Sequence, residues 1–266
     1  MSDSALRGAR VLVADVLDLT EPLQEQEWDA PSACRGWQVQ DVIAHLAAFF
    51  AILADPTAGK PLTPTDPTEA VNEEMVAARR HRTASQVRQE YQQSSQLALE
   101  ALASMENPAV ASRLVCMGDI GSYPLSAMSE AVCFDHLCHL VHDLLAPAGP
   151  LQRPRPPLDE VRLAPALDWM LRGLPTMSGP DLAAALDHPV VLELSGPGGR
   201  RVRIARDDDT GVRITPAPTV GDDDLVRTEG IAFLAWATHR VSWHDIVALH
   251  GDENRVGRVL DRIRVV

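Results

Sequence analysis

The feature that most constrains the fold is a change of hydrophobic pattern at a proline-rich segment, residues 146–157. Before this segment the apolar residues recur at the spacing of amphipathic helices, whereas beyond it some of them form short runs typical of strands. A proline-rich segment acts as a semi-rigid linker. We therefore predict two domains, residues 1–147 and residues 158–266, which a chain of 266 residues is long enough to form.

Helical periodicity predicts four helices in the first domain, at residues 5–19, from 39 onward, at 69–105 and at 125–145. The segment 54–68 contains four prolines and one glycine, so it is predicted to be a loop. Its length exceeds that of an ordinary helix connection, which suggests a role such as covering a site. Four helices of this kind form a bundle whose core can hold a metal site.

The second domain is predicted to be a small α+β domain. Three helices are expected, at residues 159–173, 229–239 and 253–263. Short strands are expected at 190–194, 201–204, 212–214 and 247–249, separated by turns rich in glycine and aspartate. The fold class is therefore α plus α+β, with a four-helix bundle preceding the smaller domain.

Composition argues against several classes of partner. The formal net charge is −13, and Lys60 is the one lysine, so nucleic-acid and membrane partners are not expected. No stretch approaches eighteen uninterrupted apolar residues, and the N-terminus lacks the pattern of a signal peptide. The four cysteines form no Cys-x-x-Cys motif. We expect a reduced, cytoplasmic protein, and the sequence leaves its oligomeric state open.

Three residues are candidates for one metal site. Asp135 and His139 are four positions apart on the predicted helix 125–145, so their side chains share a face, and His45 can add a third ligand from another helix. Three protein ligands leave an open coordination position, as in catalytic zinc sites. Iron, nickel and manganese also accept these ligands. The alternative is a hydrogen-bonded core histidine beside an unrelated helix pair. His142 or Asp143 is a candidate for orienting a ligand imidazole; the alternative is that both are ordinary solvated or hydrogen-bonded side chains.

The run from Trp28 to Leu46 reads W-x-x-P-S-x-C-x-G-W-x-V-x-D-V-x-A-H-L. It resembles the N-terminal signature of the mycothiol-dependent maleylpyruvate isomerase family, which belongs to the DinB-like metal-binding four-helix bundles. The resemblance implies that His45, Asp135 and His139 are the metal ligands, and that a small α+β domain follows the bundle. Asp135 stands where the best-known isomerase of the family has glutamate.

The resemblance also implies a function. It predicts a divalent metal ion, with Zn²⁺ favoured, and mycothiol as a low-molecular-weight thiol co-substrate, acting on a small electrophilic substrate as an isomerase or a thiol S-transferase. Arg79, Arg80 and Arg82 form a basic cluster, and an arginine in this region is expected to bind anionic groups. The spacing does not say which of the three corresponds, and Arg79 and Arg82 are taken as the candidates; the alternative is a solvated helix end. Two other functions stay open: a non-catalytic metal-binding sensor or interaction protein, and a metal-dependent hydrolase that activates water.

Overall fold

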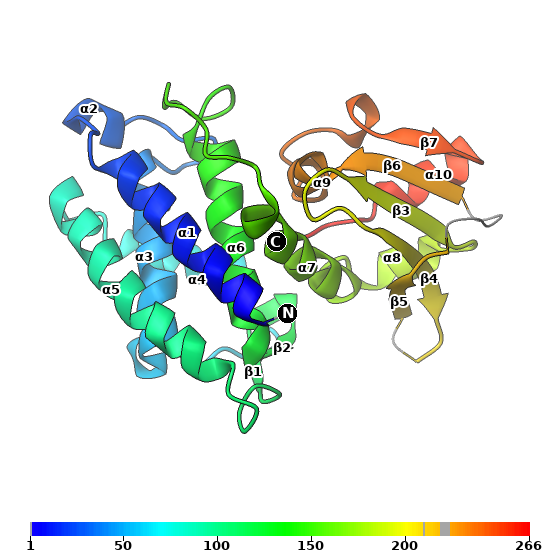
Figure 1. Ribbon diagram of the computed structural model, residues 1–266, viewed down its shortest axis with the longest axis horizontal. Helices are drawn as coiled ribbons and strands as arrows, with labels where there is room; N and C mark the ends of the chain where they lie inside the picture. Colours follow the sequence, from blue (N-terminus) through cyan, green and yellow to red (C-terminus); the bar gives the residue numbers. More distant parts are fainter. Residues whose placement is uncertain (1, 210, 219–223) are drawn as a thin grey trace. The chain divides into compact units, whose positions relative to one another are not determined.

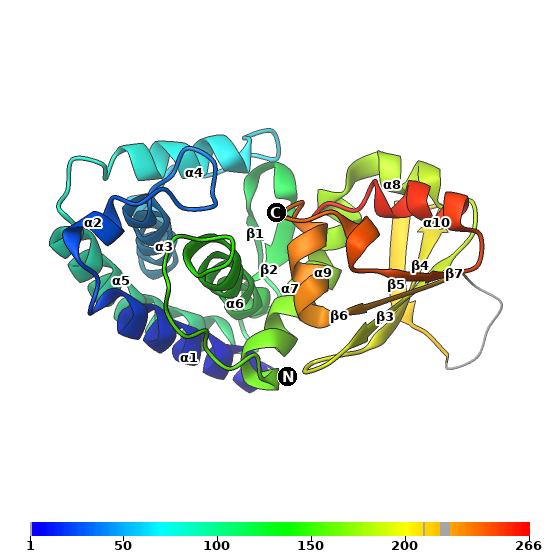
Figure 2. The same ribbon diagram turned by 90° about the horizontal axis from the view of Figure 1, so that it is seen from above.

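Four helices form the centre of the first unit, which ends at Pro157 (Figure 1). They are α1 (Ser2–Thr20), α3 (Val39–Ala54), α5 (Ala84–Met105) and α6 (Met128–Cys138). In this computed structural model, which describes residues 2–209, 211–218 and 224–266, α3 packs mainly against α5 and α1 mainly against α6 (Figure 2). Fully buried Leu12, Ile43, Leu102 and Leu137 contribute one large apolar side chain from each helix. Burial of these apolar faces stabilises the bundle.

Shorter elements connect these helices. They are α2 (Glu25–Trp28), η1 (Pro56–Ala58), α4 (Thr68–Ala77), β1 (Leu114–Cys116), η2 (Gly118–Ile120), β2 (Ser122–Pro124), η3 (Leu125–Ala127) and η4 (His139–Leu144). Strands β1 and β2 pair in antiparallel fashion and form a hairpin that helical periodicity does not predict. The predicted helix 125–145 is a composite of η3, α6 and η4, of which η4 is a π-helix.

The prediction of one long helix over residues 69–105 is wrong, because the chain turns between α4 and α5. The Thr83 hydroxyl accepts a hydrogen bond from the Gln86 backbone N–H, and the Gln86 side-chain oxygen accepts one from the Thr83 N–H. This reciprocal pair is a capping box, which starts a new helix by satisfying backbone donors that would otherwise be free. The Thr-x-x-Gln spacing of the cap can be read from the sequence. The residues on both sides of it are polar, however, so hydrophobic periodicity does not mark the break between the two helices.

The second unit runs from Leu158 to Val266 and has the predicted α+β composition. Its elements are α7 (Glu160–Met177), α8 (Gly179–Ala185), β3 (Val190–Ser195), β4 (Arg201–Asp207), β5 (Gly211–Pro216), β6 (Asp224–Glu229), α9 (Gly230–Ala237), η5 (Trp243–Asp245), β7 (Ala248–His250) and α10 (Glu253–Leu260). The strand order is β5-β4-β3-β6-β7, with β3 and β6 parallel and the other pairs antiparallel. The sequence pattern does not predict α8 or β6, but the fold class itself is confirmed.

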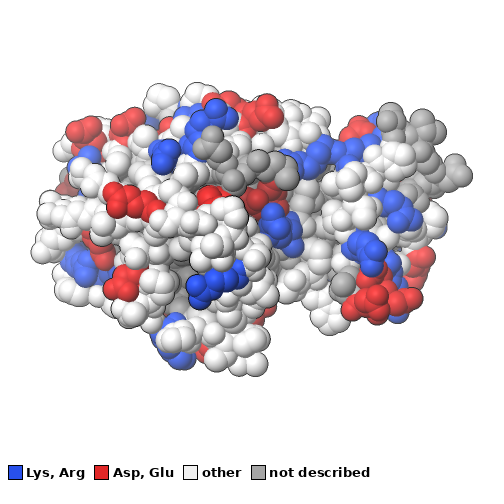
Figure 3. Space-filling model, turned by 60° about the horizontal axis from the view of Figure 1, so that its bottom comes forward, with Lys and Arg blue, Asp and Glu red and all other residues white. Residues whose placement is uncertain are grey.

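The described helices include none that combines the length and the apolar character needed to cross a membrane. On the face drawn in Figure 3, the described Lys and Arg side chains are scattered among Asp and Glu side chains. The absence of a nucleic-acid partner stays a prediction.

Asp224 anchors the start of α10 to the first residue of β6. Its carboxylate accepts hydrogen bonds from Arg255 Nε at 2.7 Å, from Arg255 Nη2 at 2.9 Å and from the Asp252 N–H at 3.2 Å. The Asp224 side chain is 4% exposed and that of Arg255 is 31% exposed. The bonds from Arg255 outweigh the effect of burial and lower the pKa of Asp224. Gly251 has φ +115°, and a Cβ at that position would clash with the same carboxylate.

We predict that Asp224→Asn destabilises the second unit by about 1–3 kcal/mol at neutral pH, because it leaves a hydrogen-bonded cation without its anion. The folded-state pKa of Asp224 is depressed, so this stability is present in full above the unfolded-state pKa of about 3.9 and is lost as pH falls through the folded-state pKa. Urea unfolding at a series of pH values should show the variant and the unaltered protein converging in acid. Asp187→Asn is the control, because Asp187 is exposed and its ion pair with Arg258 is long, at 3.8 Å. An equal loss of stability at every pH would contradict the prediction.

Candidate functional site

The three predicted ligand residues lie together in the first unit. One carboxylate oxygen, Asp135 Oδ1, is 3.2 Å from His45 Nε2 and 3.3 Å from His139 Nε2. These groups can each offer one ligand atom within 4.8 Å of the others. The side chains of His45 and His139 are 7% and 11% exposed, whereas that of Asp135 is 19% exposed. The site is therefore largely buried.

Local structure explains why these side chains meet. Helix α3 begins at a capping box in which the Gln38 N–H donates to Asp41 Oδ2 at 3.0 Å, and His45 follows one turn later. Around His45, the apolar residues Val42, Ile43 and Leu46 are fully buried and fix the rotation of the helix. Asp135 and His139 lie one turn apart where α6 passes into η4, as the i, i+4 spacing predicts.

The charges at this site support one another. Burial disfavours the carboxylate of Asp135, but the neighbouring His45 and His139 outweigh it and hold the pKa of Asp135 well below its ordinary value. Burial likewise disfavours the imidazolium of His139, but hydrogen bonds with Asp135 and Asp143 outweigh it and raise the pKa of His139 well above its ordinary value. A positive charge is thus favoured between the two carboxylates.

The donor set fits a divalent cation. Asp135 Oδ2 and His45 Nδ1 are both buried and have no hydrogen-bond partner among the residues that the structure describes. An unsatisfied carboxylate oxygen in a buried site is costly, and a bound cation removes that cost. Two imidazoles and one carboxylate are ligands that zinc and other first-row transition metals accept.

Asp143 lies on the opposite side of the His139 ring. His139 Nδ1 is 2.8 Å from Asp143 Oδ2, and the Asp143 side chain is only 2% exposed. With Nδ1–H donated to this carboxylate, Nε2 faces Asp135 and His45 and is available to a metal. A carboxylate in this position fixes the orientation of a ligand imidazole and raises its basicity. The prediction that Asp143 can orient a ligand thus has a specific contact to support it.

Cys34 is the residue that sequence reasoning missed at this site. Its Sγ is 3.6 Å from His139 Nδ1, so Cys34, His139 and Asp143 form a second group able to hold a metal. The Ala33 N–H donates to the Asp143 backbone oxygen at 3.0 Å, which ties the Cys34 loop to the π-helix η4. The signal was present, since Cys34 is part of the run from Trp28 to Leu46, but no spacing rule connects it with His139.

His136 does not belong to the candidate metal site. It is fully buried, with Nδ1 3.0 Å from the Val132 backbone oxygen and Nε2 3.1 Å from the Tyr91 hydroxyl. Burial lowers the pKa of His136 to about 4. His136 is therefore a neutral core residue that joins α6 to α5.

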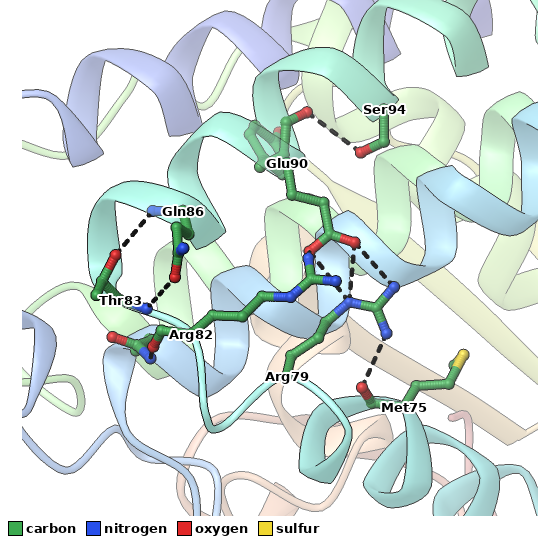
Figure 4. A network of polar contacts seen from close by, with 9 residues as sticks. Met75, Arg79, Arg82, Thr83, Gln86, Glu90 and Ser94 are labelled. Carbon is green, nitrogen blue, oxygen red and sulfur yellow. Dashed lines mark hydrogen bonds and ion pairs between the residues drawn. The ribbon is translucent and has the colours of Figure 1, made fainter.

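Arg79 and Arg82 both point toward the carboxylate of Glu90 (Figure 4). Arg79 Nη2 is 2.9 Å from Glu90 Oε1, and Arg79 Nη1 also donates to the Met75 backbone oxygen at 2.9 Å. Arg82 Nη1 forms a second ion pair with the same carboxylate. These contacts connect the end of α4 with α5. The role of Arg79 and Arg82 in binding a substrate stays a prediction.

Comparisons with known proteins support the resemblance. A family model described as the mycothiol maleylpyruvate isomerase N-terminal domain matches residues 9–144, just over half of the chain. Two solved structures, the crystal structure of the mycothiol-dependent maleylpyruvate isomerase and that of a His-to-Ala mutant of it, each align at 19% identity with a TM-score of 0.56. Each alignment covers 94% of this chain and 92% of the other, and it shows a shared fold. No curated protein matches the chain.

The two possible ligand groups make different predictions. If His45, Asp135 and His139 hold the ion, His45→Ala should abolish tight binding, because it removes one of three ligands. Cys34→Ser should then leave the stoichiometry at about one ion per chain. Metal analysis after equilibrium dialysis against Zn²⁺ measures both variants. If Cys34→Ser loses the ion and His45→Ala retains it, the ion is held instead by Cys34, His139 and Asp143.

We also predict that Asp143→Asn weakens zinc binding by about 10- to 100-fold, since the neutral amide supports the His139 imidazole less well than the carboxylate does. Competition titration with a chromophoric chelator measures the affinity. Asp18→Asn, on the exposed side of α1, is the control for loss of one negative charge from the same unit. Equal affinities in the two variants would show that Asp143 does not act on the site.

Proposed function

The chain belongs to the mycothiol maleylpyruvate isomerase N-terminal domain family, and from that premise we propose that it is a metal-dependent, mycothiol-using isomerase of a small electrophilic substrate. His45, Asp135 and His139 are proposed to hold one divalent ion, with Zn²⁺ favoured. Thiol S-transfer is the alternative reaction, because it uses the same nucleophile on a different electrophile. We propose a cytoplasmic location, since mycothiol is a small thiol of the reduced cell interior.

The observation that carries the proposal is the convergence of two imidazoles on a single carboxylate oxygen. Three ligand groups leave coordination positions for an exogenous molecule, which favours a catalytic role over a structural one. The orientation of His139 by Asp143 supports the same interpretation, because catalytic metal sites depend on such outer carboxylates.

The chemistry follows from general properties of thiols. A divalent ion supplies the positive charge that keeps a coordinated thiol deprotonated at neutral pH. A thiolate that adds to the carbon–carbon double bond of a cis-enoyl compound forms a C–S bond. The displaced π electron pair moves onto the conjugated carbonyl oxygen as an enolate, which leaves a single bond in place of the double bond and returns the pair when the thiolate departs. Rotation about that bond, followed by loss of the thiolate, gives the trans isomer and regenerates the thiol reagent. No oxidant, reductant or net proton is consumed.

The residues of the chain are suited to positioning rather than to nucleophilic attack. Cys133 and Cys138 are buried, and burial raises the pKa of the Cys133 thiol. Cys34 faces His139 Nδ1, which is the side of the ring turned away from Asp135 and His45. An external thiol is therefore a better candidate for the attacking nucleophile than any of these three cysteines.

Arg79 and Arg82 are proposed to bind anionic groups of the thiol or the substrate. Both guanidinium groups share the single carboxylate of Glu90, so the three side chains together keep one net positive charge. A carboxylate that reached this cluster would find donors already ordered, which lowers the entropic cost of binding.

The test combines a spectroscopic measurement with an assay. We predict that adding mycothiol to the Co²⁺-loaded protein produces the near-ultraviolet charge-transfer absorption of a cobalt–sulfur bond. Replacement of all four cysteines by serine or alanine should leave this band intact in a folded protein. The same loaded protein should convert maleylpyruvate to its trans isomer only when mycothiol is present. His139→Ala is the control for metal-independent turnover.

The outcomes separate the candidate functions. A cobalt–sulfur band without isomerisation would favour S-transfer. Metal binding with no band at saturating mycothiol would favour the hydrolase or the sensor. Loss of the band on changing one cysteine alone would identify a protein ligand in place of the external thiol.

A further inference from the structure

The indole of Trp37 lies against two of the three candidate ligands. Its ring centroid is 5.3 Å from that of His45, at an interplanar angle of 44°, and 6.4 Å from that of His139, at 30°. The two imidazoles are 5.2 Å apart in an edge-on arrangement. These distances are those of packed aromatic rings. One side chain thus touches both histidines, and a rotation of the indole would disturb both together.

The backbone of Trp37 is fixed within its own loop. Its N–H donates to the Cys34 oxygen at 3.0 Å, and its oxygen accepts from the Ser32 N–H at 2.9 Å and from the Ser32 hydroxyl at 2.8 Å. Gly36, with φ +85°, provides the left-handed backbone conformation that this turn needs. These bonds fix the position of the Cα atom but leave the torsions of the side chain free.

Helix α4 provides the contact that fixes the indole itself. Trp37 Nε1 donates to Glu73 Oε2 at 2.8 Å. Arg80 Nη1 holds the other oxygen of Glu73 at 2.7 Å, and Arg80 Nε reaches Asp41 Oδ1 at 3.3 Å. Asp41 is also the acceptor in the capping box of α3, the helix that carries His45. The chain of contacts therefore leads from α3 through α4 back to the indole that packs on His45.

We propose that Glu73, held in place by Arg80, is a positioning residue, which acts through the Trp37 indole to set the geometry of His45 and His139. The expected effect on catalysis rests on the proposed function, whereas the expected effect on metal binding does not. Helix α4 thus influences the geometry of the candidate metal site, although it carries none of the three candidate ligands. Glu73 and Arg80 are both exposed, so the contacts are open to solvent and can be changed without disturbing the core of the bundle.

The experiment compares Glu73→Ala, Glu73→Gln and Trp37→Phe with the control Glu74→Ala. Glu74 is the neighbouring exposed residue of α4 and carries the same charge. The d–d absorption spectrum of the Co²⁺-loaded protein reports ligand geometry, and chelator competition reports affinity. We expect Glu73→Ala to shift the spectrum and weaken Co²⁺ binding by about 3- to 10-fold, which is less than the effect of a carboxylate bonded directly to a ligand. Glu73→Gln should recover part of the affinity, because its amide oxygen still accepts the indole N–H.

A double change gives the decisive result. Trp37→Phe removes the indole donor, so adding Glu73→Ala to it should cause little further loss of Co²⁺ affinity. In the isomerase assay, the Glu73 variants should lower kcat more than they raise KM, since the ligands are displaced and not the substrate contacts. Additive effects on affinity, or a Glu73→Ala spectrum identical to that of Glu74→Ala, would overturn the proposal even if the protein is an active isomerase. A protein that binds Co²⁺ and responds as expected, but lacks isomerase activity, would overturn the proposed function alone.

Discussion

The fold depends at its centre on one carboxylate placed inside a helical bundle. Removing the Asp135 carboxylate from water costs free energy, and this cost must be met by neighbouring positive charge or by a metal. His45 and His139 both contact this carboxylate, and they hold the pKa of Asp135 well below its ordinary value. The arrangement connects α3 with α6, so the residues that suit a metal also fix the register of two helices that belong to different parts of the sequence.

The site extends outward from this carboxylate on two sides. On one side, Asp143 orients His139, and its backbone oxygen holds the loop that contains Cys34. Both contacts come from the π-helix η4, in which the Leu145 N–H donates to the Leu140 oxygen five residues earlier. On the other side, the Trp37 indole covers both histidines and is held from α4. Both sides involve the loop between α2 and α3, which carries Cys34 and Trp37.

The sequence was most informative where a single physical rule acts over a short distance. The i, i+4 spacing placed Asp135 and His139 on one face, and apolar periodicity located α1 and α3. It was least informative where two segments meet through space. Cys34 and Glu73 reach the site by loop and helix packing, for which no local spacing exists. Strand β6 was missed because its sequence, DLVRTE, contains only two adjacent apolar residues and shows neither an apolar run nor an alternation. The break before α5 was missed although its capping residues are local, because a polar helix and a polar turn have similar composition.

The pairing of Arg79 and Arg82 with Glu90 bears on how an anionic ligand can reach the first unit. A carboxylate that already occupies both guanidinium groups competes with any incoming anion, so such a ligand must either share the donors or displace Glu90. Sharing is favoured by charge, because two cations and one anion keep a net positive charge, whereas displacement leaves a partly buried Glu90 without partners. The proposed anion-binding role is therefore compatible with an intact Glu90 contact.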